Sequence, residues 1–186
     1  MSLILGVDPG LTRCGLGLIE SSAGRKVQFR SVEVLESGKS EDTATRIHGI
    51  GRQLAEYLDR VNPDSIALER VFSQQNLSSV MGTAQISGVV FYLATQRGIP
   101  IALHTPTEVK AAVTGSGRAN KAQVGTMVAK ILGLSEMPRP ADAADSLAIA
   151  ICHAWRGSVD VGSRADTPAQ IAWRRAAEAS QKSRRV

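Results

Sequence analysis

The chain has 186 residues, of which 43% are hydrophobic and only 4% aromatic, so its length predicts one domain with an aliphatic core. The two cysteines form neither a C-x-x-C pair nor a Cys/His cluster, which excludes a zinc site and a disulfide framework and favours the cytoplasm. No apolar stretch reaches membrane-spanning length, no signal peptide is expected, and the net charge of +5 favours a polyanionic partner.

The chain begins with three predicted strands. Residues 3–8 are almost all apolar, as in a strand that is buried on both faces of a sheet. This strand ends at Asp8, and the Pro-Gly pair that follows turns the chain. Residues 13–20 and 26–35 alternate in polarity after short connections, which predicts an antiparallel meander. One slip in the alternation of the third strand indicates a β-bulge.

Helices and strands alternate after the meander. Apolar residues between Ile47 and Val61 fall on one stripe of an amphipathic helix. A buried strand is predicted at residues 65–71, with Glu69 near its end. A second helix at residues 79–98 is apolar around much of its circumference, which is consistent either with burial inside the domain or with a subunit interface.

The remaining elements complete an α/β pattern. They are a strand at 99–104, a short helix that opens at Thr107, a loop at 115–120, and helices at 121–132 and 141–155. We therefore predict a mixed five-stranded sheet, a three-strand antiparallel meander plus parallel strands, flanked by helices in one domain over residues 1–156. Residues 157–186 are predicted to be a mobile basic tail, because residues 156–186 hold seven bases and three acids.

Four carboxylates are candidates for one site. Asp8 alone could simply cap its turn, and Asp142 and Asp145 alone could simply favour the start of a helix. However, Asp8 and Glu69 end two strands that are expected to be parallel neighbours, and the last helix can aim its N-terminus at them. Oxygen ligands without His or Cys suit Mg²⁺ or Mn²⁺. Carboxylates that hold such ions are typical of metal-assisted phosphodiester cleavage.

The order of these elements and acids resembles the ribonuclease H-like fold. The stretches GVDPGLTRCG, ALERVF, VKAAVTGSGRANKAQV and DAADSLAIAICHA resemble the RuvC family of bacterial Holliday junction resolvases, over residues 1–155. This resemblance implies a magnesium-dependent homodimeric endonuclease that nicks two symmetry-related strands of a four-way DNA junction. It further implies roles in DNA recombination and repair, one or two Mg²⁺ ions per subunit, with Mn²⁺ as a substitute, and RuvA and RuvB as partners. The catalytic metal ligands would be Asp8, Glu69, Asp142 and Asp145.

Three further residues match functional positions of the family, and a fourth is a weaker candidate. The resemblance implies that Phe72 stacks on an unpaired base, although a phenylalanine more often fills a core. Lys110 and Lys121 would neutralise phosphates, and Lys121 would also act in catalysis; the alternative for both is a solvated surface. Arg118 is a weaker candidate for a phosphate contact.

Three other functions are alternatives: a nucleotide-binding ATPase, a nuclease of the same fold with another substrate, and a non-catalytic DNA-binding module. Residues 115–122 resemble a phosphate-binding loop of ATPases, but Asn120 replaces the second glycine, Ala122 replaces Ser/Thr, and a helix is predicted before the loop. Residues 8–12 resemble the phosphate loop of actin-like kinases, which have two such domains where this chain has room for one. A nuclease of the same fold could instead cut RNA in a hybrid duplex. A non-catalytic DNA-binding module is disfavoured by the intact set of acids.

Overall fold

The computed structural model describes residues 1–70 and 77–156, with side chains for residues 1–70 and 80–156. Its centre is one five-stranded sheet in the order β3-β2-β1-β4-β5. The strands are β1 (Ser2–Asp8), β2 (Arg13–Ser22), β3 (Lys26–Glu36), β4 (Ser65–Glu69) and β5 (Ile101–His104). β1 lies in the middle of the sheet, as its continuous apolar run predicts.

The strand pairing confirms the predicted mixed sheet. β1 pairs antiparallel with β2 and parallel with β4, and β4 pairs parallel with β5. β2 and β3 pair antiparallel with one shift of register, because Leu18 lies opposite Ser31 whereas Ile19 lies opposite Phe29. Arg30 is therefore the extra residue on β3, and the β-bulge expected in this strand is confirmed.

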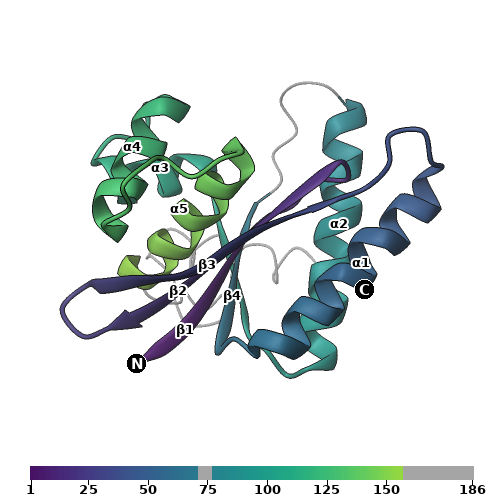
Figure 1. Cartoon of the computed structure of the whole chain (residues 1–186), viewed down its shortest axis with the longest axis horizontal. Coiled ribbons are helices and arrows are strands. Elements are labelled where there is room, and N and C mark those ends of the chain that lie inside the picture. The colour runs from purple at the N-terminus through teal and green to yellow at the C-terminus, as the bar shows by residue number, and fades with distance from the viewer. Residues whose placement is uncertain (71–76, 157–186) are drawn as a thin grey trace, which may run out of the picture.

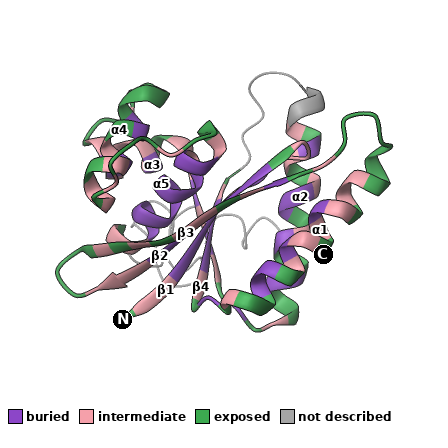
Figure 2. Cartoon of the chain, in the orientation of Figure 1, coloured by how far each residue is buried: buried purple, intermediate pink, exposed green. Residues whose placement is uncertain are grey.

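The helices cover both faces of the sheet (Figure 1). α1 (Thr43–Val61) and α2 (Leu77–Gln96) pack on one face, while α3 (Pro106–Thr114), α4 (Lys121–Leu132) and α5 (Ala141–Arg156) lie on the other. Alternate residues of β1 enter the two cores, since Leu5 joins the first and Ile4 the second. Figure 2 shows that α5 is buried along most of its length, as befits a helix between the sheet and the helices α3 and α4.

Helix ends follow local capping chemistry. Asp42 accepts hydrogen bonds from two backbone N–H groups at the start of α1, and Asn62 ends this helix in the left-handed conformation. α3 begins earlier than predicted, because Thr105 rather than Thr107 is its N-cap and forms a reciprocal capping box with Glu108. The other corrections are small: β4 ends at Glu69, α2 begins at Leu77 and β5 begins at Ile101.

Close packing of α5 on the sheet depends on glycines in β1 and β2. A Cβ atom on Gly6 would overlap the carbonyl oxygen of Ser146, and one on Gly15 would overlap the carbonyl oxygen of Asp142. The backbone of α5 therefore lies directly on the backbone of the sheet. This packing brings the first turns of α5 to the end of β1, where Asp8 lies.

Several predictions concern other features. Cys14 and Cys152 are free and buried, as expected for small core residues. Within the part of the chain that the structure describes, no helix is long and apolar enough to cross a membrane. Phe72 and the basic tail at residues 157–186 lie outside the described residues, so their roles and the domain boundary at residue 156 stay predictions.

Candidate active site

Three of the predicted carboxylates face one cavity. Val7 of β1 is in register with Leu68 of β4, so Asp8 and Glu69 follow at the same edge of two adjacent parallel strands. Asp145, from the start of α5, lines the same cavity of about 270 Å³. The sheet edge and the helix start therefore bring together acids that are far apart in the sequence.

Burial and mutual repulsion disfavour ionisation of Asp8 and Glu69. Burial, followed by the charges of Glu69, Asp145 and Asp142, raises the pKa of Asp8 from 3.8 to about 8. The pKa of Glu69 is also raised, first by burial and then by the charge of Asp145. Without a compensating cation, Asp8 therefore retains at neutral pH a proton that an isolated carboxyl group would lose.

Lysine side chains supply part of the compensating charge. Lys121 begins α4, and its Nζ lies 3.1 Å from Oδ2 of Asp145. This hydrogen bond and the charge of Asp145 raise the pKa of Lys121, which therefore stays protonated at neutral pH. Lys110, on α3, lines the same cavity, and its charge lowers the pKa of Glu69.

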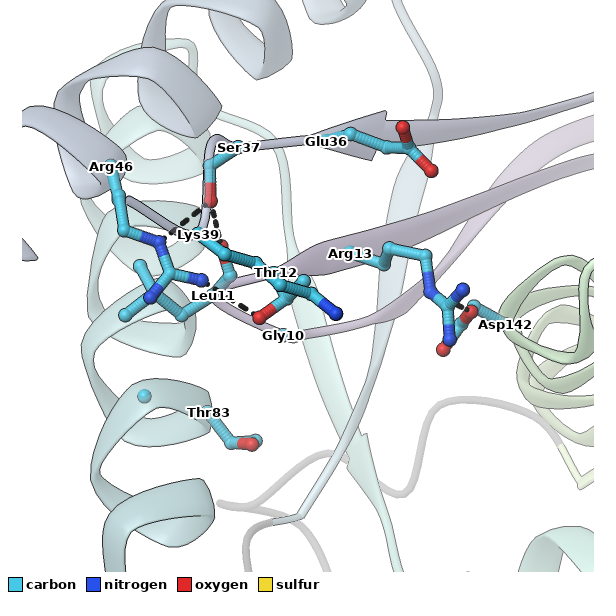
Figure 3. A pocket seen from close by; sticks show the side chains of 11 residues that line it. Gly10, Leu11, Thr12, Arg13, Glu36, Ser37, Lys39, Arg46, Thr83 and Asp142 are labelled. Atoms are coloured by element: carbon cyan, nitrogen blue, oxygen red, sulfur yellow. Dashed lines mark hydrogen bonds and ion pairs between the residues drawn. The ribbon is translucent and has the colours of Figure 1, made fainter. Parts of the chain in front are cut away.

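The fourth carboxylate, Asp142, is arranged differently. It lines a neighbouring cavity of about 800 Å³, where Nε of Arg13 lies 2.9 Å from its Oδ2 (Figure 3). This Oδ2 atom is buried and accepts no hydrogen bond, so the contact with Arg13 is an ion pair without hydrogen-bond geometry. Asp142 still raises the pKa of Asp8, which places its charge within electrostatic reach of that residue. The predicted convergence of four acids in one cleft is thus only partly observed.

The carboxylate oxygens of the acids are suitable ligands for a divalent cation, but the acids are not arranged as a complete metal-binding site. Among residues 1–70 and 77–156, no group of three or more His, Cys, Asp or Glu side chains is arranged to hold a metal ion. The donors are all carboxylate oxygens, which suit a hard cation. A cation would also relieve the repulsion that raises the pKa of Asp8, and it would satisfy the buried Oδ2 of Asp142. We therefore regard the residues as compatible with such an ion.

The structure does not bring every predicted site residue to this cavity. Arg118 is exposed and lines a different cavity, with Ser116 and Asn120, in the loop between α3 and α4. The same loop settles the comparison with ATPases, because the helix α3 precedes it where a phosphate-binding loop would follow a strand.

A family model for crossover junction endodeoxyribonuclease RuvC matches residues 4–153 of the chain. The chain belongs to the RuvC family. Its curated relatives include RuvC proteins of Parafrankia sp., 56% identical over 90% of this chain and 94% of the relative, and of Bifidobacterium adolescentis, 52% identical over 98% of this chain and 95% of the relative. The resemblance noted in the sequence is therefore confirmed.

Solved structures agree with this assignment. The structure of Thermus thermophilus RuvC in complex with a Holliday junction substrate superposes with a TM-score of 0.77 and 34% identity, over 83% of this chain and 93% of the other. The yeast mitochondrial Holliday junction resolvase Ydc2 superposes with a TM-score of 0.58 at 16% identity, over 81% of this chain and 78% of the other, which supports the fold alone. The predicted ribonuclease H-like α/β fold is confirmed.

Sequence reasoning missed Arg13 and the packing glycines. Arg13 begins β2 and is the partner of Asp142, yet the two residues are separated by most of the chain. Nothing in the local pattern around Arg13 indicates this partner. Gly6 and Gly15 did carry a usable signal, because a glycine inside a strand often marks a close approach by another backbone.

Proposed function

We propose that this chain resolves four-way (Holliday) DNA junctions by paired, symmetric hydrolysis of phosphodiester bonds during homologous recombination and DNA repair. The observation that carries this function is the single cavity lined by Asp8, Glu69 and Asp145 together with Lys110 and Lys121. Acids there can hold cations, and lysines can attract a phosphate, which is the combination that a nuclease needs. The junction complex of Thermus thermophilus RuvC supports the choice of substrate.

Each charged residue has a proposed role. Asp8, Glu69, Asp142 and Asp145 would hold one or two Mg²⁺ ions, for which Mn²⁺ could substitute. When bound, such an ion supplies polarisation of the scissile phosphate and activation of water. Lys121, which already neutralises Asp145, also stabilises negative charge as the phosphate is attacked. Lys110, which also lines the cavity, binds the phosphate.

Two further residues are proposed to contact DNA away from the acids. Arg118 is exposed on the loop between α3 and α4, where it can reach a backbone phosphate. Phe72 follows Glu69 by three residues and is proposed to stack on an unpaired base at the junction centre. Because stacking contributes about 1–3 kcal/mol per base, Phe72→Ala should slow cleavage by an order of magnitude or more without changing thermal stability.

The enzyme is proposed to act as a homodimer, because a four-way junction has approximate two-fold symmetry and one subunit makes one nick at a time. α2 supports this proposal. Ile86 and Val90 on α2 are buried, while Met81 and Tyr92 expose 57% and 66% of their surface. Such an apolar exposed face is typical of an interface. RuvA and RuvB, as branch-migration proteins, are the proposed partners, and the cytoplasm is the proposed compartment.

The substrate assay tests the function directly. One preparation is assayed with Mg²⁺ on a four-way junction, on a linear duplex of the same sequence and on an RNA–DNA hybrid. We expect nicks in two opposite strands of the junction and ligatable products. The linear duplex and the RNA–DNA hybrid should be cut little. Equal cleavage of the hybrid would identify a nuclease of the same fold with another substrate, and ATP hydrolysis by the pure protein would revive the kinase-like alternative.

A further inference from the structure

Apart from Asp142, the residues that line the larger cavity, beside the candidate active site, have no role in the function proposed above. It opens between the β1–β2 turn, the segment that follows β3, and the helices α1 and α2 (Figure 3). Asp142 lines this cavity, whereas Asp145, three residues later on α5, lines the cavity of the active site. The two cavities therefore flank the first turns of α5. A DNA strand that crosses the start of this helix would pass both of them.

Arg46, on α1, is a cation held in place by neutral groups. Its Nη2 donates a hydrogen bond to Oγ1 of Thr12 at 2.7 Å, and its Nε donates one to Oγ of Ser37 at 3.0 Å. The Ser37 hydroxyl in turn donates to the carbonyl oxygen of Leu11 at 2.5 Å, which fixes its orientation.

In the part of the chain that the structure describes, no carboxylate lies within ion-pair distance of Arg46. Within the described residues, Arg46 forms no ion pair, unlike Arg13 and Arg52. Two of its five N–H donors go to the hydroxyls, so others remain for an anion. A partly buried, preorganised guanidinium without an acidic partner is suited to a phosphate, which it can bind through two parallel hydrogen bonds.

The other charged groups of the cavity favour an anion near Arg46. Lys39 is exposed, and in Figure 3 its side chain extends past Thr12 into the space between Arg46 and Arg13. The charge of Asp142 is opposed by Arg13. Glu36, the remaining acid of the lining, is exposed, and in Figure 3 its carboxylate points away from Arg46. Arg46 and Lys39 thus form a basic pair on this side of the carboxylates.

We propose that Arg46 and Lys39 bind a backbone phosphate of the junction strand, next to the phosphate that is cleaved. This inference rests on the proposed function, since it names a second contact of the same substrate. Thr12 and Ser37 orient the guanidinium, and Lys39 adds a mobile second charge. A contact with the backbone sets the position of the strand over the acids without selecting a base sequence. Arg46 and Lys39 are therefore positioning residues, because they do not touch the reacting atoms.

The test measures junction binding against salt concentration, in Ca²⁺ or EDTA, for Lys39→Ala, Arg46→Ala and Arg46→Lys. Each alanine variant should weaken binding roughly tenfold and lower the slope of log K against log salt by about 1. Arg52→Ala is the matched control, because Arg52 is exposed on the same helix and pairs with Glu56. For Lys39→Ala, the apparent KM should rise by a larger factor than the cleavage rate at saturating junction falls.

Two outcomes would overturn the proposal. If Lys39→Ala and Arg46→Ala change the salt slope no more than Arg52→Ala, this cavity does not contact DNA. If Arg46→Ala lowers only the thermal stability and Lys39→Ala binds the junction normally, the role of Arg46 is to stabilise the packing of α1 against the β1–β2 turn. The proposed function fails separately, when the wild-type protein neither binds nor cuts a four-way junction.

Discussion

Nζ of Lys121 lies 3.1 Å from Oδ2 of Asp145, so the first residue of α4 neutralises an acid in the first turns of α5. The charge of Lys121 also lowers the pKa of both Asp8 and Glu69. One cation, placed by the packing of α4 on α5, thus acts on three carboxylates from three different elements.

Replacing Lys121 should change the pH dependence of cleavage as well as its rate. In Lys121→Ala, the pKa values of Asp8 and Glu69 rise further, so fewer carboxylates are ionised at neutral pH and the acid limb of the pH–rate profile moves to higher pH. Loss of the charge near the phosphate should also slow single-turnover cleavage about 100-fold at pH 7. Lys130→Ala, exposed on the same helix, is the control. If cleavage by Lys121→Ala were slower at every pH but the acid limb of its pH–rate profile did not move, Lys121 would not influence the pKa values of the acids.

The stability of the metal-free protein should depend on Asp8. Because the pKa of Asp8 is about 8 when folded and 3.8 in its ordinary state, the folded protein binds a proton that the unfolded chain has lost between these values. The free energy of unfolding therefore falls as pH rises through this window, and Asp8→Asn should stabilise the protein at pH 8 by on the order of a few kcal/mol.

The comparison is best made in EDTA between pH 6.5 and 8. Burial lowers the pKa of His104 from 6.5 to about 4, so His104 makes the protein more stable as pH rises to about 6.5 and has little effect above it. Urea titrations of wild type and Asp8→Asn should diverge as pH increases, and Mg²⁺ should narrow the difference. If the free energies of unfolding of the two proteins changed in parallel with pH, Asp8 would be ionised in the folded protein without a loss of stability.

The same substitution at two glycines should have opposite effects. Gly15→Ala places a Cβ against the carbonyl of Asp142, so the start of α5 must move away from the sheet, at a cost of about 1–3 kcal/mol of stability. Gly49 lies inside α1 with open space at its Cβ position, so Gly49→Ala should stabilise by about 0.5–1 kcal/mol. Denaturant melts measure both. Cleavage should fall in Gly15→Ala only; if Gly15→Ala were as stable and active as the wild type, the close packing of α5 would not be needed.

The proposed dimer predicts a loss of paired nicking when α2 is altered. Tyr92→Glu puts a charge on the exposed apolar face of this helix and should yield monomers in sedimentation experiments. On a junction in a supercoiled circle, such monomers should release nicked circles instead of linear products. Ser135→Glu adds the same charge in the exposed loop between α4 and α5 and should remain dimeric. If the Tyr92→Glu protein still formed dimers, the dimer interface would not lie on this face of α2.

The sheet, the helices and the three acids of the cavity could be predicted because their signals are local. The apolar run before Asp8 predicts a central strand, and the strand pattern at residues 65–71, with Glu69 near its end, predicts the parallel neighbour of that strand. The spacing of Asp142 and Asp145 places both on one helix, but it does not say that they line different cavities. Which way each carboxylate faces depends on partners that the helix meets only after folding.

The contacts of the basic residues near the site could not be predicted from the sequence, for the same reason. Arg13 pairs with an acid on the last helix, and Arg46 is held by hydroxyls from the β1–β2 turn and from the segment after β3. Each pairing crosses elements that are distant in the chain, and an arginine near a strand or in a helix has no periodic signature. Such contacts depend on the packing of the whole domain and not on local propensity.

The most direct test of the account is the cleavage of a four-way junction by Asp8→Asn in Mg²⁺, measured beside the binding of the same junction. This change removes one carboxylate from the cavity and one repulsive charge from its neighbours, so binding should be at least as tight as in the wild type. Cleavage should fall by at least about 1,000-fold, because the remaining acids hold the metal ion incompletely. Near-normal cleavage by Asp8→Asn would contradict the assignment of the active site.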